Sequence, residues 1–207
     1  GKFHKAAILF QAIALLVAMV FSLALVYPAQ AATTVVAGEV SGTWDAAGSP
    51  YLVEGDITVP AGATLTIEPG VQVIFQSWYR LTVNGTLQAD GTDSAPVLFS
   101  APDGGPGWPG IRFIGASNSS SLTHVIVERG RATGASPLNL GGGIYIENSS
   151  PTIRFSTIRD NFAIKGGGGI ALIQSDAILS GNTFINNHAG QGGSASGGGL
   201  YLSYSNP

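Results

Sequence analysis

Short alternations of apolar and polar residues recur along the chain. In each one, two apolar residues flank a single residue that is mostly polar, as in ITV at 57–59, LTV at 81–83 and IRF at 111–113. Such alternation predicts half-buried β-strands, because successive side chains of a strand point to opposite faces. No stretch after Ala32 shows the 3.6-residue apolar periodicity of a helix, so the pattern predicts an all-β chain.

These strands recur as a repeat whose members begin 24 to 33 residues apart. The interval is too long for hairpins, whose loops usually have about 2–5 residues. Three short strands fit into each interval, which is typical of one coil of a parallel β-helix, where each strand pairs with its counterpart about 4.8 Å away. The equivalent strands begin at Ile57, Leu81, Ile111, Ile144, Ile170 and Leu200.

Alternation also assigns the faces of these strands. A column of stacked aliphatic and aromatic side chains should fill the interior, and each coil buries its apolar edge because its neighbours cover it. The inward side chains are Ile57/Val59, Leu81/Val83, Ile111/Phe113, Ile144/Ile146, Ile170/Leu172 and Leu200/Leu202. The side chains expected to face solvent are Thr58, Thr82, Arg112, Tyr145, Ala171 and Tyr201.

Glycine triplets precede the last three of these strands, at 141–143, 167–169 and 197–199. We expect the triplets at a corner between strands, because glycine reaches positive φ and lets backbones approach closely. Asn161 and Asn187 end the two complete units and should occupy another corner in the left-handed conformation, with hydrogen bonds along the stack. A disordered glycine-rich linker is the alternative, but such linkers lack regularly recurring Ile, Leu and Phe.

The N-terminus has the pattern of an export signal. Lys2 and Lys5 precede an apolar run over 6–26, and Ala29-Gln30-Ala31 fits a small-x-small cleavage site. An uncleaved anchor is the alternative, because about 20 apolar residues can span a bilayer. The expected organisation is a signal peptide over 1–31, an N-terminal cap segment over 32–56 and a β-helix over 57–207.

Composition narrows the possible partners. The chain has no cysteine, so disulfides and thiolate metal sites are excluded. Its net charge is −3 and only 10% of its residues are charged. We therefore expect no nucleic-acid partner, because such a surface needs clustered Lys and Arg.

Two groups of motifs resemble known families. The GGG[IL] tracts with FINN at 184–187 resemble the repeats of polymorphic outer membrane proteins. The stretches 49–75, 81–101 and 107–113 resemble the opening coils of exported bacterial β-helix proteins of the pectate-lyase-like superfamily. One repeat departs from the pattern, because IRDN at 158–161 has Ile where the motif has Phe.

The resemblance implies a right-handed parallel β-helix, in agreement with the handedness of parallel crossovers. The fold class expected is thus an all-β solenoid of about five coils plus an incomplete sixth, preceded by a hydrophobic signal helix. SYSNP at 203–207 aligns with ENSSP at 147–151, so we expect further coils after Pro207 in a longer chain. The alternative is a true terminus whose open edge docks on another chain.

Candidate chemistry is sparse. Acidic residues are scattered over turns, and neither D-x-D nor H-E-x-x-H occurs. Glycan-cleaving enzymes use two facing carboxylates or a metal held by clustered acids. We therefore expect no catalytic group, no metal and no cofactor in this segment.

The binding candidates are aromatic and charged side chains. If Tyr145 and Tyr201 face outward two coils apart, their rings stand about 9.6 Å apart and could stack on sugars. Ordinary surface residues are the alternative, and Ala171 interrupts the tyrosine ladder. The loops near these strands add Arg129, Arg131, Arg159, Asp160, Lys165 and His188.

Three functions remain open at this point. The first is an exported module, extracellular or at the cell surface or outer membrane, that acts as an adhesin, binding module or stalk and presents a face to glycan or protein. The second is the N-terminal part of a polysaccharide lyase or glycoside hydrolase with catalytic coils downstream. The third is a purely structural envelope protein. The superfamily hosts several of these activities, so the fold does not choose among them.

Overall fold

The computed structural model describes residues 31–190 and 196–207. The predicted signal peptide, 1–31, lies outside the described residues except for Ala31. One short 3-10 helix, η1 (Ala46–Gly48), occurs among the described residues, and the rest of the regular structure is β. No helix in this part of the chain has the length and apolar character needed to cross a membrane.

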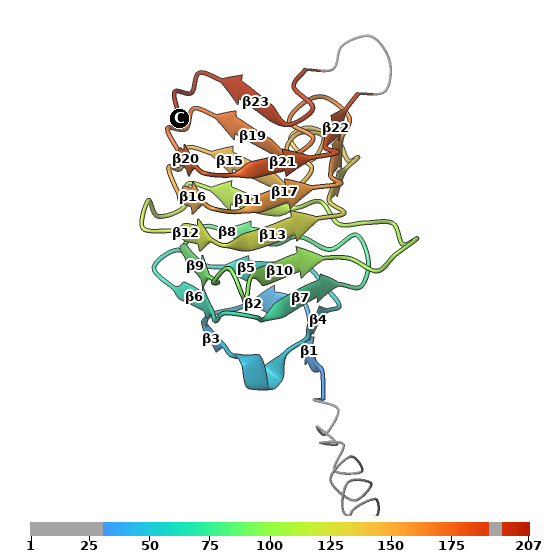
Figure 1. Cartoon of the computed structure of the whole chain (residues 1–207), viewed down its shortest axis with the longest axis vertical. Helices are drawn as coiled ribbons and strands as arrows, with labels where there is room; N and C mark the ends of the chain where they lie inside the picture. Colours follow the sequence, from blue (N-terminus) through green and yellow to red (C-terminus); the bar gives the residue numbers. More distant parts are fainter. Residues whose placement is uncertain (1–30, 191–195) are drawn as a thin grey trace, which may run out of the picture. The chain divides into compact units, whose positions relative to one another are not determined.

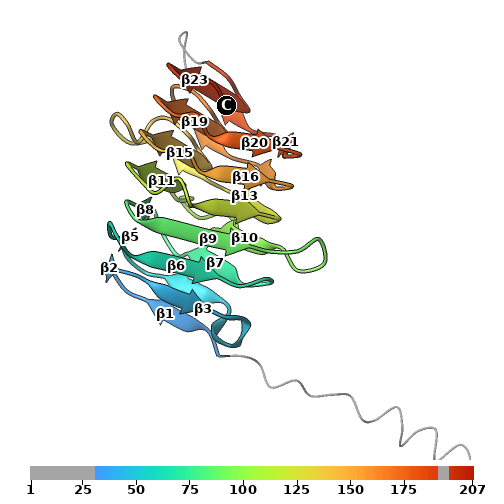
Figure 2. The same ribbon diagram turned by 90° about the vertical axis from the view of Figure 1, so that its left-hand side faces the viewer.

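The strands form parallel sheets in which each strand lies beside its counterpart from the next coil (Figures 1 and 2). Sheet A contains β1 (Thr33–Val35), β4 (Tyr51–Val53), β7 (Gln72–Phe75), β10 (Val97–Ser100), β13 (Val125–Glu128), β17 (Thr157–Arg159) and β21 (Thr183–Ile185), in that order. Sheet B contains β2 (Gly38–Glu39), β5 (Ile57–Val59), β8 (Leu81–Val83), β11 (Ile111–Ile114), β15 (Ile144–Glu147), β19 (Ile170–Ile173) and β23 (Leu200–Ser203). Sheet C contains β3 (Gly42–Trp44), β6 (Thr64–Ile67), β9 (Thr86–Asp90), β12 (Ser121–Thr123), β16 (Thr152–Arg154) and β20 (Ile178–Ser180). A fourth, short sheet contains β14 (Arg131–Ala132), β18 (Phe162–Ala163) and β22 (His188–Ala189).

The register of sheet B is the one that the repeat predicts. The paired residues that begin successive strands are Ile57, Leu81, Ile111, Ile144, Ile170 and Leu200. The predicted all-β, parallel arrangement, which a β-helix requires, is thus confirmed. Strands β1 to β4 come from the predicted cap segment 32–56 and also pair in parallel, so the ladders begin before Ile57.

Side chains from sheets A, B and C meet in one hydrophobic core. The predicted inward column of sheet B is fully buried from Ile57 to Leu172. Its last members differ: Leu200 is half-buried and Leu202 is 43% exposed. Strand β23 is the outermost strand of its sheet, so it has a neighbour on one side only.

The outward face of sheet B departs from expectation. Arg112, Tyr145 and Ala171 were expected to face solvent, but they are 1%, 2% and 0% exposed. The prediction of exposure is therefore wrong for these three residues. The physical reason at Arg112 and Tyr145 is a covering segment, 135–138, which lines a cavity together with them. Alternation fixes which face a side chain occupies, but it does not reveal which loop covers that face.

The glycine triplets turn the chain into sheet B, as predicted. Gly167, the first glycine of its triplet, has φ +61°. A Cβ on Gly168 would overlap the backbone carbonyl oxygens of His188 and Gly198. Only glycine fits where successive coils approach so closely, and this explains a flexible tract beside an ordered strand.

The asparagines form the predicted hydrogen-bonded stack at a second corner. The Asn161 side chain accepts from the Gly130 N–H at 2.8 Å and donates to the Val127 carbonyl at 2.9 Å. Its Nδ2 also donates to Oδ1 of Asn187 at 3.0 Å. The prediction of a left-handed backbone at Asn161 and Asn187 is wrong. The residues immediately before them, Asp160 and Asn186, adopt that conformation instead.

Candidate ligand-binding site

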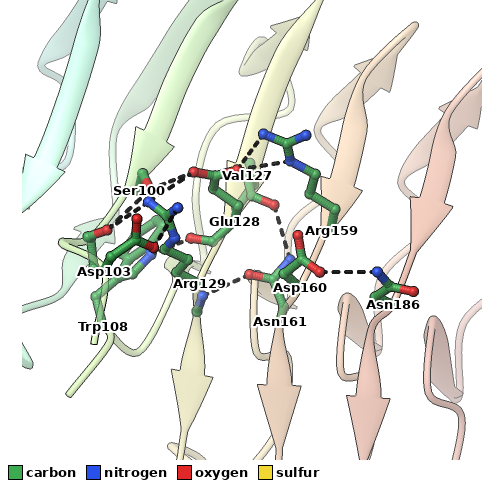
Figure 3. Close-up of polar contacts among 12 residues, drawn as sticks. Ser100, Asp103, Trp108, Val127, Glu128, Arg129, Arg159, Asp160, Asn161 and Asn186 are labelled. Carbon is green, nitrogen blue, oxygen red and sulfur yellow. Dashed lines mark hydrogen bonds and ion pairs between the residues drawn. The ribbon is translucent and has the colours of Figure 1, made fainter. Parts of the chain in front are cut away.

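The candidate site lies where strands of sheet A end. Arg129, Asp160 and Asn186 each follow such a strand, and their φ angles are +59°, +55° and +51°. The left-handed conformation is uncommon for residues other than glycine, so three in one stack mark a defined corner. The strands β13, β17 and β21 pair in parallel, so these residues lie next to one another on successive coils (Figure 3).

A buried carboxylate organises this corner. Glu128, the last residue of β13, is 5% exposed. Its Oε1 accepts a hydrogen bond from Oγ of Ser100 at 2.7 Å, and its Oε2 accepts from Nε of Arg159 at 2.8 Å. A second Arg159 nitrogen lies 2.6 Å from Oε2, and Nη1 of Arg129 lies 3.4 Å from Oε1. Figure 3 shows Glu128 between these partners.

Opposing influences act on the ionisation of Glu128. Burial raises the pKa of its carboxyl, whereas hydrogen bonds from Ser100 and Arg159 and the charges of Arg159 and Arg129 lower it. The net result is a pKa below the ordinary glutamate value. The group is therefore an anion at neutral pH, and it anchors both arginines.

Arg129 is held in place on several sides. Its guanidinium forms an ion pair with Asp103 at 2.7 Å and donates to the Ala101 carbonyl at 3.1 Å and to Oγ of Ser100 at 3.3 Å. Below it, the indole N–H of Trp108 donates to the Glu128 carbonyl at 2.9 Å. A side chain so constrained loses little conformational entropy when a ligand binds.

A hollow of about 230 Å³ opens beside Arg129. We call it the polar hollow. Arg131 lies at its wall, and its guanidinium makes no hydrogen bond or ion pair with any described residue. Oδ1 of Asp160 accepts from Asn186 at 3.2 Å, which leaves Oδ2 without a donor in the described part of the chain. The residues that line it are Pro102, Asp103, Gly104, Gly105, Gly107, Arg129, Arg131 and Asp160.

The charged residues of the polar hollow balance one another. Two arginines and two aspartates line it, so it offers both donors and acceptors and these four residues carry no net charge. Such an arrangement suits a neutral, polyhydroxylated ligand, whose hydroxyl groups both donate and accept, better than a polyanion. The volume is below the roughly 300–1,000 Å³ of ordinary small-molecule pockets, so one unit of a longer ligand fits.

The structure brings together some of the predicted site residues and separates others. Arg129, Arg131 and Asp160 meet at the polar hollow, and Arg159 joins them through Glu128. The other four lie elsewhere. Lys165 is exposed after β18, His188 in β22 stacks on Phe162 with centroids 5.9 Å apart, and Tyr145 and Tyr201 belong to sheet B.

Sequence reasoning missed Ser100, Asp103 and Glu128. Ser100 and Glu128 could have been found from the repeat pattern. Strand β10 pairs with β13 and β13 with β17, so extending the repeat alignment to sheet A would have placed Ser100, Glu128 and Arg159 side by side. Asp103 lies in a loop without a counterpart in the other coils. Among residues 31–190 and 196–207, no group of three or more His, Asp or Glu has the arrangement of a metal site.

Comparison with known proteins yields a short local similarity. No family model matches the chain, and no solved structure matches it. A stretch of 53 residues, 26% of this chain, is 47% identical to Protein bark beetle of Drosophila melanogaster. The chain spans 2% of the length of that relative, so the similarity concerns a small part of a much longer protein.

Proposed function

We propose that this chain is an exported, right-handed β-helix module that binds glycan through the polar hollow. Its first 31 residues serve as the signal peptide, and the coils belong to the pectate-lyase-like type, about five with an incomplete sixth. The observation that carries the binding role is that a fixed guanidinium, Arg129, lies beside two exposed groups without a protein partner in the described part of the chain, the Arg131 guanidinium and Oδ2 of Asp160.

Sugar hydroxyls match these groups. A guanidinium donates two parallel hydrogen bonds, and a carboxylate accepts two, so each can engage neighbouring hydroxyls of one ring. Arg129 is already ordered by Asp103 and Glu128, which reduces the cost of binding. The proposal assigns recognition to hydrogen bonds, because no aromatic side chain lines the polar hollow among the described residues.

The test is binding of the purified protein to an array of neutral and acidic glycans, followed by titration calorimetry with the strongest ligand. Arg131→Ala should weaken binding at least tenfold, because it removes the free guanidinium and leaves the Glu128 cluster intact. Arg154→Ala is the matched control. Arg154 is also an exposed arginine of a short strand, β16, but it lies outside the polar hollow.

Two results would overturn the proposal. Equal binding by wild type and Arg131→Ala would show that the polar hollow does not bind the glycan. Failure of every glycan on the array to bind would show that glycan is not the ligand. New chain ends in the bound glycan would instead favour the lyase or hydrolase alternative. Binding without cleavage, lost in Arg131→Ala and kept in Arg154→Ala, is the result expected.

A further inference from the structure

A second cavity, of about 310 Å³, lies on the outer face of sheet B under segment 135–138. We call it the Arg112 cavity. Arg112 in β11 and Tyr145 in β15 are paired residues of adjacent strands and form part of its lining. Ile114, Pro137 and Leu138 give it apolar walls, and Arg80, Thr82, Ala135 and Ser136 also line it.

Arg112 carries an unpaired charge buried beside this cavity. Its side chain is 1% exposed, and its Nη1 donates to the Leu140 carbonyl at 2.6 Å. Its Nε and Nη2 are buried and have no hydrogen-bond partner. A buried polar group without a partner is costly, and a buried charge without a counter-ion is more so. These two nitrogens therefore mark a place where a partner is missing.

Neighbouring groups do not supply that partner. The Tyr145 ring lies with its centroid 5.0 Å from the guanidinium carbon, which provides a cation–π contact but accepts no hydrogen bond from Nε or Nη2. Arg80 adds a second positive charge, but Asp56 pairs with it at 2.8 Å. Burial, and to a smaller extent Glu147, raises the pKa of Tyr145 to about 12. No ion pair joins Glu147 to Arg112.

The charge of Arg112 persists at neutral pH. Burial lowers its pKa to about 9, with a smaller contribution from the positive charge of Arg80, while Tyr145 acts in the opposite direction. Since a pKa of about 9 leaves the guanidinium protonated at pH 7, the cavity holds one uncompensated positive charge. A single negative charge would neutralise it.

The geometry of the free nitrogens selects the anion. Nε and Nη2 form one edge of the planar guanidinium, and their N–H groups are nearly parallel. A carboxylate accepts two such hydrogen bonds at once, which is the strongest way for an arginine to bind one. The apolar walls at Ile114, Pro137 and Leu138 then suit a ligand whose carboxylate is attached to an apolar body.

We propose that the Arg112 cavity binds a small monocarboxylate with an apolar body, which displaces the groups that now cover Nε and Nη2 of Arg112 and pairs with that edge. This site lies on sheet B and uses none of the residues of the polar hollow, so it stands independently of the glycan-binding proposal. The carboxylate can belong to a free organic acid or to the terminus of a peptide, because the recognition chemistry is shared.

The experiment uses benzoate as the probe and benzamide as its neutral, equally shaped control. Binding is measured by calorimetry and by the shift in melting temperature of the protein. Benzoate should bind saturably, and benzamide and acetate should bind at least tenfold more weakly, because one lacks the charge and the other the apolar body. A short peptide ending in Phe, compared with its C-terminal amide, distinguishes a peptide terminus from a free acid.

Variants locate the site. Arg112→Met should bind benzoate at least tenfold more weakly while retaining the melting temperature of the free protein, because it removes a buried unpaired charge and keeps the packing. Arg112→Lys keeps the charge without the two-pronged edge and serves as the second variant, with the same expected loss. Arg131→Ala, in the polar hollow, should bind benzoate as wild type does.

The results that would overturn the proposal are equally specific. Equal binding of benzoate and benzamide, or no binding of either, would show that the unpaired nitrogens do not select a carboxylate. Undiminished benzoate binding by both Arg112 variants would place the probe elsewhere. Loss of benzoate binding in Arg131→Ala would refute the independence of the two sites.

Discussion

The asparagine stack offers a direct test of how successive coils are held together. Asn161 is 1% exposed, and its side chain joins three coils through Gly130, Val127 and Asn187. Replacing it by alanine removes these bonds and leaves the buried N–H of Gly130 without its acceptor. The change is small in volume, so its effect reports on hydrogen bonding more than on packing.

The size of the effect follows from the contacts. An orphaned buried donor costs about 1–3 kcal/mol, and each further lost hydrogen bond costs about 0.5–1.5 kcal/mol. Asn161→Ala should therefore lower the free energy of unfolding by about 2–6 kcal/mol. That is a large share of the roughly 5–15 kcal/mol typical of folded proteins.

The assay is urea unfolding followed by circular dichroism and tryptophan fluorescence. Asn84→Ala is the matched control, because the Asn84 side chain makes a single hydrogen bond, to the Ile114 carbonyl at 3.0 Å, near the surface. Asn84→Ala should lower the free energy of unfolding by no more than about 1.5 kcal/mol, the upper value for one such hydrogen bond. A loss for Asn161→Ala no larger than for Asn84→Ala would refute the role given to the stack.

Three further predictions concern the core, the corner and the buried carboxylate. Ile170→Asp places a charge at a fully buried position and should lower the melting temperature sharply, whereas Ile178→Asp, at a 49% exposed position, should change it little; equal melting temperatures would contradict the inward column. Gly168→Ala should lower the free energy of unfolding by about 1–3 kcal/mol in urea, because its Cβ overlaps two backbone carbonyls; an unchanged midpoint would contradict the close approach of the coils. The pKa of Glu128 is lowered in the folded protein, so its contribution is present above the ordinary glutamate value of 4.5 and is lost as the pH falls further. The stability difference between wild type and Glu128→Gln should thus shrink at acid pH, and a difference constant from pH 7 to pH 3 would argue against an ionised, anchored carboxylate.

The sequence predicted the ladder of sheet B well for a physical reason. A solenoid repeats the same local environment in each coil, so aligning the glycine triplets also aligned Ile144, Ile170 and Leu200, which pair as expected. The glycine corners followed from the same logic, because backbone contact between coils leaves no space for a side chain.

The sites were harder to predict because they depend on what differs between coils. Two segments have no counterpart in the other repeats, so the repeat pattern does not predict them. They are segment 135–138, which covers Arg112 and Tyr145, and the loop that carries Asp103. Arg129, Arg131 and Asp160 were found as charged loop residues, but only the fold shows that they share one hollow. The partner of Arg159 was missed because the alignment was not extended to sheet A.

Both proposed sites depend on strands from different coils lying side by side, so the inter-coil register is the central claim. Ile126 pairs with Thr157 across β13 and β17, and Thr157 pairs with Thr183 across β17 and β21. The chain has no cysteine, so pairs can be introduced without interference. Adjacent strands lie about 4.8 Å apart, within disulfide range, and alternate strands roughly 9 to 10 Å apart, beyond it.

The most direct measurement is oxidative cross-linking of two double variants, read by mass spectrometry. Ile126→Cys with Thr157→Cys should form an intramolecular disulfide in the folded protein, and Ile126→Cys with Thr183→Cys should not. Equal cross-linking of the two pairs, or preference for the second, would contradict the stacking on which both sites are built.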